Sequence, residues 1–142
     1  MAVAFYCADV QFKLPQQAKL KKFIANSYYT ATGKRLHLDY IFCSDEYLLD
    51  LNNRHLGHDY YTDIITFDLS DNPKKTDAEI YISIDRDEDN AIKLKQAISD
   101  ELFRVLFHGV LHLAGYLDHS KKEKAQMRKM EEEWMMAYKK EK

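Results

Sequence analysis

The feature that most constrains this chain is an apolar helical segment that ends in two histidines four residues apart. Residues 108–119 read His-Gly-Val-Leu-His-Leu-Ala-Gly-Tyr-Leu-Asp-His. Residues i and i+4 lie one above the other on a helix, so His108 and His112 can both reach one metal ion. The glycine after them can end the helix, and Asp118 or His119 can then return as a third ligand. Three protein ligands with an open position are typical of a catalytic zinc site rather than a closed structural one.

Length and composition fit one globular domain that covers residues 1–142, with an ordinary hydrophobic share of 46%. The net charge of −2 neither indicates nor excludes nucleic acid, because a site can be basic locally on a near-neutral protein. No stretch is apolar enough to span a bilayer and no secretion signal is apparent, so a cytoplasmic protein with no membrane partner is expected. Cys7 and Cys43 lie in apolar stretches without metal-like spacing and are expected to be buried, reduced thiols.

The hydrophobic pattern predicts an α/β (α+β) fold with a small mixed four-stranded sheet and about four helices. Strands are expected over residues 3–10, 35–43, 64–69 and 79–84, which are rich in β-branched and aromatic side chains. Helices are expected over residues 15–33, 44–57 and 121–138, and from about residue 88 into the histidine motif. The helix that bears the motif is apolar enough to be the buried central helix.

A histidine pair at helical spacing is weak evidence for a metal when it stands alone. Here the pair lies in an apolar helix, where an imidazole without a partner would be costly to bury. Val110, Leu111 and Leu113 would form a dry wall, which favours ionisation of a metal-bound water near neutral pH. The spacing therefore favours a metal-dependent hydrolase over a purely structural use of the two histidines.

The motif is similar to the zinc-protease pattern H-E-x-x-H-x-x-G-x-x-H, except that Gly109 stands where the protease has its glutamate. That glutamate is the general base of such proteases. Without it, peptide hydrolysis has no obvious base at this place, and a residue this small leaves room for something bulky beside the metal. A different substrate is implied, although a metallopeptidase stays open as an alternative.

The motif also resembles the signature of the YbeY family of bacterial endoribonucleases, which is close to H-G-x-L-H-L-x-G-Y-D-H. A second family stretch, which ends T-D-V-L-S-F, is similar to residues 44–67, and a third, G-D-I-x-I-S, is similar to residues 78–83. In the second stretch the matching residues are Leu51, Asn52, Thr62, Asp63 and Phe67. The resemblance covers nearly the whole chain.

Membership of this family implies a zinc-dependent endoribonuclease specific for single-stranded RNA, with one zinc ion per chain. It implies a role in ribosomal RNA maturation, at the 3′ end of the small-subunit RNA, and in ribosome quality control. Ribosomal RNA and ribosomal particles are the implied partners, and no oligomeric state is indicated. Histidine ligands also accept nickel and other borderline metals.

The chain departs from the family signature at Leu117, which is one residue more than the family's Tyr-Asp-His spacing. Counted from His108, the third ligand position is Asp118, whereas a one-residue bulge would restore His119. Carboxylate oxygen is a legitimate zinc ligand, and Asp118 is favoured because no bulge is needed. An aspartate ligand would leave the site less positive and would raise the pKa of a bound water.

A second departure is that the family's Tyr-Arg pair, whose arginine is suited to hold phosphate, maps onto His55-Leu56. Leucine cannot hold phosphate, and RNA cleavage would be weaker or absent if nothing replaces the arginine. The possible replacements are Arg54, His55, His58 and Arg104. A solvated surface position is the simpler interpretation of Arg54.

Other charged residues allow two interpretations each. Asp63 could brace a turn, contact substrate or orient a ligand histidine. Glu101 could be a remote base, but a solvated carboxylate is expected. A group of basic residues follows the histidine motif: Lys121, Lys122, Lys124 and Arg128. These side chains could hold an RNA backbone, or they could form a solvated helix face whose charge is compensated by the glutamates at 131–133. Leu56 keeps a third function open, a non-catalytic ribosome-binding factor stabilised by its metal.

Overall fold

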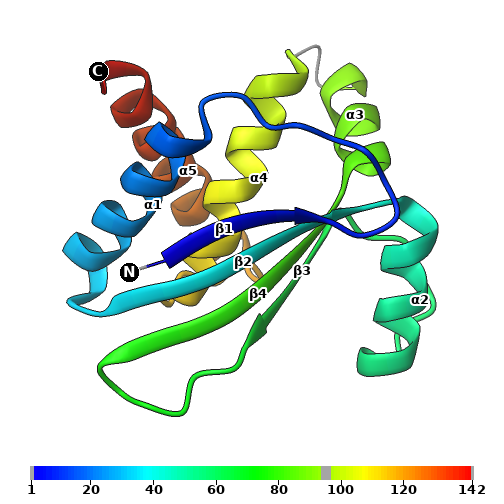
Figure 1. Ribbon diagram of the computed structural model, residues 1–142, viewed down its shortest axis with the longest axis horizontal. Coiled ribbons are helices and arrows are strands. Elements are labelled where there is room, and N and C mark those ends of the chain that lie inside the picture. The colour runs from blue at the N-terminus through cyan, green and yellow to red at the C-terminus, as the bar shows by residue number, and fades with distance from the viewer. Residues whose placement is uncertain (1, 94–96, 142) are drawn as a thin grey trace.

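Four strands form one mixed sheet in the order β1-β2-β4-β3 (Figure 1). The first three of these run parallel, and β3 pairs antiparallel with β4 at one edge. The strands are β1 (Ala2–Cys7), β2 (Arg35–Cys43), β3 (Ile64–Asp68) and β4 (Lys75–Ser83). This computed structural model describes residues 2–93 and 97–141. The predicted mixed four-stranded sheet is confirmed.

Five helices occur among the described residues, which is one more than the sequence suggested. They are α1 (Gln17–Thr32), α2 (Asp45–Leu56), α3 (Ile84–Lys93), α4 (Ile98–Leu113) and α5 (Lys121–Lys140). The expected single helix from about residue 88 is wrong, because the extended backbone of Ala97 precedes a separate helix that starts at Ile98.

The ends of three strands also differ from the prediction, and β3 stops at Asp68, one residue before its predicted end. β1 ends at Cys7 rather than at residue 10, since the chain turns there and Asp9 accepts hydrogen bonds from the backbone and hydroxyl of Ser44. β4 starts at Lys75, where it begins to pair with β2, and stops at Ser83. Residue 84 already belongs to α3, because the Ser83 hydroxyl accepts from the backbone N–H of Arg86 and so caps a helix there.

The larger core lies between one face of the sheet and α1, α4 and α5, which lie together on that side (Figure 1). Alternate residues of β2 and β4, such as Tyr40 and Ile80, point into it and are fully buried. The Tyr40 hydroxyl donates to the carbonyl oxygen of Leu106 at 2.7 Å, which ties α4 to the sheet. On α5, Met127 and Trp134 are buried in this core. The helix with the histidine motif is therefore held between sheet and helices.

A smaller core lies on the opposite face of the sheet, where α2 packs on β3 and β4. It contains Cys43, Leu48, Leu51 and Ile65. Burial raises the pKa of the Cys43 thiol to about 12, with nearby aspartates adding to the effect, so this cysteine is an inert thiol as expected. Cys7 is exposed, so its predicted burial is wrong. Among the described residues, no helix combines the length and the apolar composition needed to cross a membrane.

Candidate functional site

A cavity of about 460 Å³ lies beside the C-terminal half of α4. Its walls come from α4 and the segment after it, from the loop between α2 and β3, and from β3 itself. The lining side chains that can carry chemistry include His58, Tyr60, Asp63, His108, His112 and Asp118. The volume falls in the range of pockets that hold small ligands. Residues far apart in the sequence therefore share one site.

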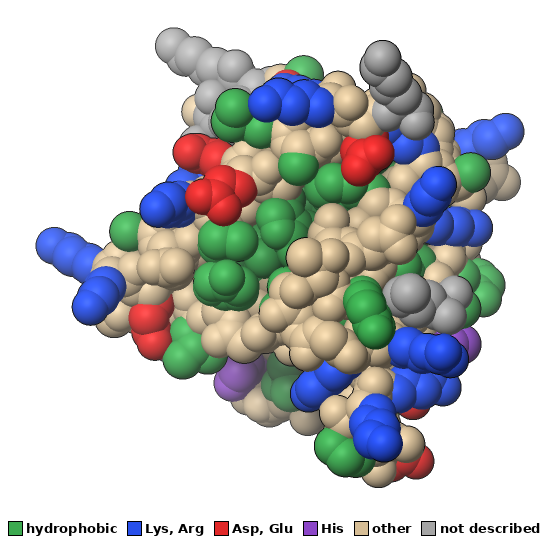
Figure 2. Space-filling model, turned by 90° about the vertical axis from the view of Figure 1, so that its left-hand side faces the viewer, with side chains coloured by type: hydrophobic (Ala, Val, Ile, Leu, Met, Phe, Trp, Pro, Cys, Tyr) green, Lys and Arg blue, Asp and Glu red, His purple; other side chains and the backbone are tan. Residues whose placement is uncertain are grey.

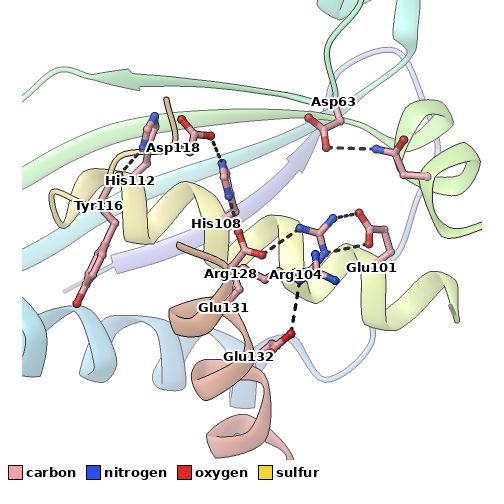
Figure 3. A network of polar contacts seen from close by, with 11 residues as sticks. Asp63, Glu101, Arg104, His108, His112, Tyr116, Asp118, Arg128, Glu131 and Glu132 are labelled. Carbon is pink, nitrogen blue, oxygen red and sulfur yellow. Dashed lines mark hydrogen bonds and ion pairs between the residues drawn. The ribbon is translucent and has the colours of Figure 1, made fainter. Parts of the chain in front are cut away.

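In the rings of His108 and His112 the Nδ1 nitrogen is occupied (Figure 3). The Nδ1–H of His108 donates to Oε2 of Glu131 at 2.6 Å, and that of His112 donates to the carbonyl oxygen of Tyr116 at 2.7 Å. Metal-binding histidines usually donate their other ring N–H to a carboxylate or a carbonyl in this way. In the neutral ring, this arrangement leaves the lone pair of Nε2 for a ligand.

The two candidates for the third ligand lie in different surroundings. Asp118 lines the cavity, and its Oδ2 lies 3.3 Å from Nε2 of His108. His119 is exposed, and its backbone N–H donates to Glu123 as part of the start of α5. The structure thus brings Asp118, rather than His119, to His108 and into the cavity that His112 also lines.

The donor types of His108, His112 and Asp118 suit a zinc-type ion, because two imidazole nitrogens and a carboxylate leave a fourth position open. The centroids of the two rings are 5.8 Å apart and their planes are tilted by 32°. Within residues 2–93 and 97–141, no three His, Cys, Asp or Glu side chains already converge on one point. Binding an ion here would therefore require these side chains to move relative to one another.

A buried ion-pair network supports His108 from behind (Figure 3). Glu131 of α5 is buried and uses Oε1 to accept from Nη1 of Arg104 at 3.0 Å, while Oε2 accepts from His108. The other side of the Arg104 guanidinium donates to both carboxylate oxygens of Glu101, which is also buried. The orientation of His108 therefore depends on a carboxylate that an arginine holds in place.

Two sequence expectations are wrong in this network. Glu101 is not a solvated carboxylate but half of a buried ion pair, and Glu131 is not a counter-charge on a solvated face. One signal in the sequence could have revealed Glu131. It shares its helical face with Met127, Trp134 and Tyr138, and an isolated carboxylate on a buried apolar face needs a partner.

The charges of this network shift the pKa values of its members. Burial alone would lower the pKa of His108, but the hydrogen bond and charge of Glu131, with the charges of Asp118 and Asp63, raise it above the ordinary value. Burial alone would raise the pKa of Glu131, but hydrogen bonds from His108 and Arg104 lower it below its ordinary value. Glu131 is therefore an ionised acceptor at neutral pH.

Comparison with known proteins shows which family the chain belongs to. The family model described as Endoribonuclease YbeY matches residues 6–139. The chain belongs to the YbeY family. Endoribonuclease YbeY of Cytophaga hutchinsonii is 48% identical over 130 residues, covering 92% of this chain and 91% of that protein. Endoribonuclease YbeY of Porphyromonas gingivalis strain ATCC 33277 is 43% identical over 134 residues, covering 92% and 86%.

A solved structure has a similar fold. The solution structure of TM1509 from Thermotoga maritima matches with a TM-score of 0.63 at 26% sequence identity, covering 97% of this chain and 92% of that one. The resemblance inferred from the motif and the α/β fold expected with it are both confirmed.

The residues that could replace the YbeY arginine fall into two groups. Arg54 pairs with Asp50 at 2.9 Å on the exposed face of α2, and His55 packs edge-on against Phe67. Neither is among the described residues that line the cavity. His58 and Arg104 do line it, but the guanidinium of Arg104 is engaged by two carboxylates. Among described lining residues, Arg104 is the sole Arg or Lys, so the cavity offers phosphate no uncommitted cationic side chain of that kind.

Asp63 lies at the entry to β3 and lines the cavity. Its Oδ2 accepts from the side-chain amide of Asn90 at 3.4 Å, and its backbone carbonyl accepts from the N–H of Ser83 at 3.0 Å. The neighbouring Thr62 hydroxyl donates to the carbonyl oxygen of Ile64 at 3.3 Å. These bonds fit the bracing role proposed from the sequence and hold the carboxylate within the site.

At Gly109, α4 lies close against the sheet. A Cβ atom there would lie 2.8 Å from Cδ1 of Ile80 and 3.1 Å from Cδ1 of Ile64. The expectation that this glycine leaves room beside the metal is therefore wrong, because the space faces the sheet and Ile80 and Ile64 fill it. Close packing of the helix explains the glycine.

The basic residues that follow the motif lie at the start of α5, where Lys121, Lys122, Lys124 and Arg128 are exposed. Nε of Arg128 lies 3.5 Å from Glu132. Figure 2 shows the face that includes α1, with Lys and Arg side chains around its edge and acidic and apolar side chains between them. An RNA-binding role of the α5 residues stays a prediction, as does the solvated alternative.

Asp87 of α3 is a buried carboxylate next to this network, only 1% exposed. Its Oδ1 has no hydrogen-bond partner among the described residues. Burial raises its pKa to about 7, repulsion from Glu101 and Asp63 adds to this, and the charge of Arg104 opposes it. The folded protein therefore holds a proton on Asp87 at a pH where the unfolded chain has lost it.

Asp87→Asn is expected to stabilise the protein at pH 8 by about 4 kcal/mol and to leave it nearly unchanged at pH 4. The wild type should lose unfolding free energy as the pH rises from about 4, the unfolded pKa, to about 7, the folded one, because in this range the unfolded chain releases the proton of Asp87 while the native state still holds it. Asparagine removes this dependence. Urea unfolding of both proteins at pH 4, 6 and 8 measures it. Asp89→Asn, at an exposed position of α3, is the control, and parallel curves for wild type and Asp87→Asn would refute the assignment.

Proposed function

We propose that this chain is a metal-dependent endoribonuclease that hydrolyses phosphodiester bonds in single-stranded RNA. Its relatives in Cytophaga and Porphyromonas carry the name Endoribonuclease YbeY, and the alignments cover most of both chains. We infer that its substrate is ribosomal RNA, at the 3′ end of the small-subunit RNA, and that it acts on ribosomal particles in the cytoplasm, in maturation and in quality control. Zinc, one ion per chain, is the metal best suited to the donor set.

The observation that carries this proposal is the arrangement of acceptors behind the two histidines. Glu131 and the Tyr116 carbonyl each take an Nδ1–H, so each ring has its Nε2 left for a ligand. A histidine that serves packing alone has no need for this on two successive turns of one helix. Together with Asp118, these rings form a donor set of three on the wall of one cavity.

His108, His112 and Asp118 would hold the metal ion, with His119 left outside. When bound, such an ion supplies a Lewis acid for a phosphoryl oxygen and activates water near neutral pH. The carboxylate of Glu131 keeps His108 oriented and compensates positive charge on its ring. Arg104 holds Glu131, and the cavity admits one stretch of RNA backbone beside β3.

The second candidate function is a non-catalytic ribosome-binding factor that keeps the metal for stability. Leu56 favours it, because this residue lines the cavity where the family pattern has an arginine. The guanidinium of Arg104 does not compensate for this loss while two glutamates engage it. The two functions differ in whether RNA is cut.

The test measures metal content by mass spectrometry and cleavage of a single-stranded RNA for wild type and for four variants: His108→Ala, His112→Ala, Asp118→Ala and His119→Ala. We expect about one zinc per wild-type chain and at least a 100-fold loss of cleavage with a chelator. Metal should be lost with the first three variants and retained with His119→Ala.

His37→Ala, at an exposed position of β2, controls for the loss of any histidine. Metal that is retained in Asp118→Ala and lost in His119→Ala would overturn the ligand assignment. Wild type that sediments with ribosomal particles, holds its metal and cuts no RNA would establish the binding factor instead. Wild type without metal after growth in added zinc would overturn both.

A further inference from the structure

Two aromatic rings stand at the mouth of the cavity, on the loop between α2 and β3. The rings of His58 and Tyr60 are stacked, with centroids 5.1 Å apart and planes 18° apart. The Tyr60 hydroxyl lies 3.1 Å from Nδ1 of His58. Both residues line the same cavity as His108, and Tyr60 keeps 56% of its surface exposed. An aromatic face is thus presented to solvent within the site.

Hydrogen bonds, rather than burial, hold this pair in place. The side-chain amide of Asn52, which is itself buried, donates to the carbonyl oxygen of Tyr60 at 3.0 Å. The backbone N–H of His58 donates to the carbonyl oxygen of Asn52 at 3.3 Å. Gly57 turns the chain with a φ of 67° and anchors the loop start on α2. The loop therefore offers a preorganised surface, which reduces the entropy cost of binding.

The charges of the cavity indicate what this surface would bind. The guanidinium of Arg104 is occupied by Glu101 and Glu131, and the lining residue Leu56 is apolar and offers phosphate no hydrogen-bond donor. Affinity for a single strand must then come largely from contacts other than a cationic side chain. Proteins that bind unpaired RNA commonly stack its bases on aromatic side chains, and this contact tolerates every base.

We propose that His58 and Tyr60 form a base-stacking platform that holds one unpaired nucleobase of the RNA next to the metal centre. This inference rests on the proposed function and names how its substrate is held. A base within a duplex has both faces covered by its neighbours and cannot reach the platform. The platform thereby favours single strands at the step of binding.

The chain contains a matched control for Tyr60 at the next position. Tyr61 is also exposed, but its hydroxyl donates to Glu46 at 2.6 Å and its ring lies under the guanidinium of Arg86 at 5.1 Å. It is not among the described residues of the cavity. Neither tyrosine is deeply buried, so truncation of either leaves the fold intact.

The experiment follows binding of a fluorescent single-stranded oligoribonucleotide by stopped-flow anisotropy before turnover, and cleavage of the same RNA afterwards. Tyr60→Ala is expected to weaken binding about 10-fold or more, the effect of losing one base–aromatic stack. Tyr60→Phe, which keeps the ring, and Tyr61→Ala should bind like wild type. Metal content should be the same in all four proteins.

A series of the same RNA with one abasic nucleotide at each position identifies the stacked base. Wild type should lose affinity at one position next to the cut, and Tyr60→Ala should show no further loss there. Equal RNA affinity of Tyr60→Ala and Tyr61→Ala would overturn the platform. So would a loss of affinity in Tyr60→Ala, relative to wild type, that is the same for the intact RNA and for every abasic RNA. Tyr60-dependent binding without cleavage by wild type would support the platform while refuting the nuclease. Cleavage by wild type without Tyr60-dependent binding would refute the platform while supporting the nuclease.

Discussion

Glu131→Ala is expected to weaken metal binding about 10- to 100-fold and to destabilise the fold by about 3–5 kcal/mol. The carboxylate accepts from both His108 and Arg104 and is buried between them. Removal of this carboxylate leaves the ring of His108 free to rotate. It also leaves one side of the buried guanidinium of Arg104 without a hydrogen-bond acceptor. Chelator competition measures the metal affinity, and urea unfolding measures the stability.

The control for Glu131 is its neighbour Glu132, which is exposed and pairs with Arg128 at 3.5 Å one turn away. Glu132→Ala should cost about 0.5 kcal/mol or less and leave metal affinity unchanged. Glu131→Gln keeps the shape but carries no charge, so it separates the loss of packing from the loss of the carboxylate. Wild-type metal affinity in Glu131→Gln would show that the negative charge of Glu131 is not needed to orient the ring.

Gly109→Glu, which would recreate the zinc-protease pattern, is expected to give no stably folded protein, at a cost of more than about 4 kcal/mol. The first side-chain carbon would already lie 2.8 Å from Ile80 and 3.1 Å from Ile64, and the carboxylate would follow it into an apolar contact. Thermal unfolding and the yield of soluble protein measure the effect.

Gly109→Ala should be milder, with a net loss on the order of 1 kcal/mol, because the better helix propensity of alanine offsets part of the overpacking. Ala125→Glu, at an exposed position of α5, controls for the added charge. A Gly109→Glu protein with native stability would mean that the helix can move away from the sheet. The family assignment and this packing together argue against the metallopeptidase.

Much of this molecule could be predicted from the sequence because its signals are local. The alternation in β2, the serine cap before α2 and the apolar face of α4 each follow from spacing within one element. The histidine pair is local in the same sense. The break between α3 and α4 was missed, since polar residues such as Asp89 and Lys93 continue a helical pattern up to the break.

The parts of the site that were missed depend on contacts between distant segments. Glu131 contacts His108 although the two are 23 residues apart in the sequence. No local pattern around either residue indicates that the other is its partner. Arg104 and Glu101 have the spacing of an ordinary surface pair on a helix, yet the packing of α3 and α5 against α4 buries the glutamate. Residues 58 and 60 have no helical or strand periodicity, and their place at the cavity depends on the path of a loop.

The position of Glu131 on a helix that follows the histidine motif has a consequence for the order of events during synthesis. When a ribosome has released the chain as far as residue 119, both histidines and Asp118 are present, but the carboxylate that orients His108 is still to be made. Folding generally proceeds from the N-terminal side as the chain emerges. The nascent protein would therefore acquire an ordered catalytic centre late, after its sheet has formed. Under the proposed function, the chain would therefore be inactive toward RNA during most of its contact with the ribosome that makes it.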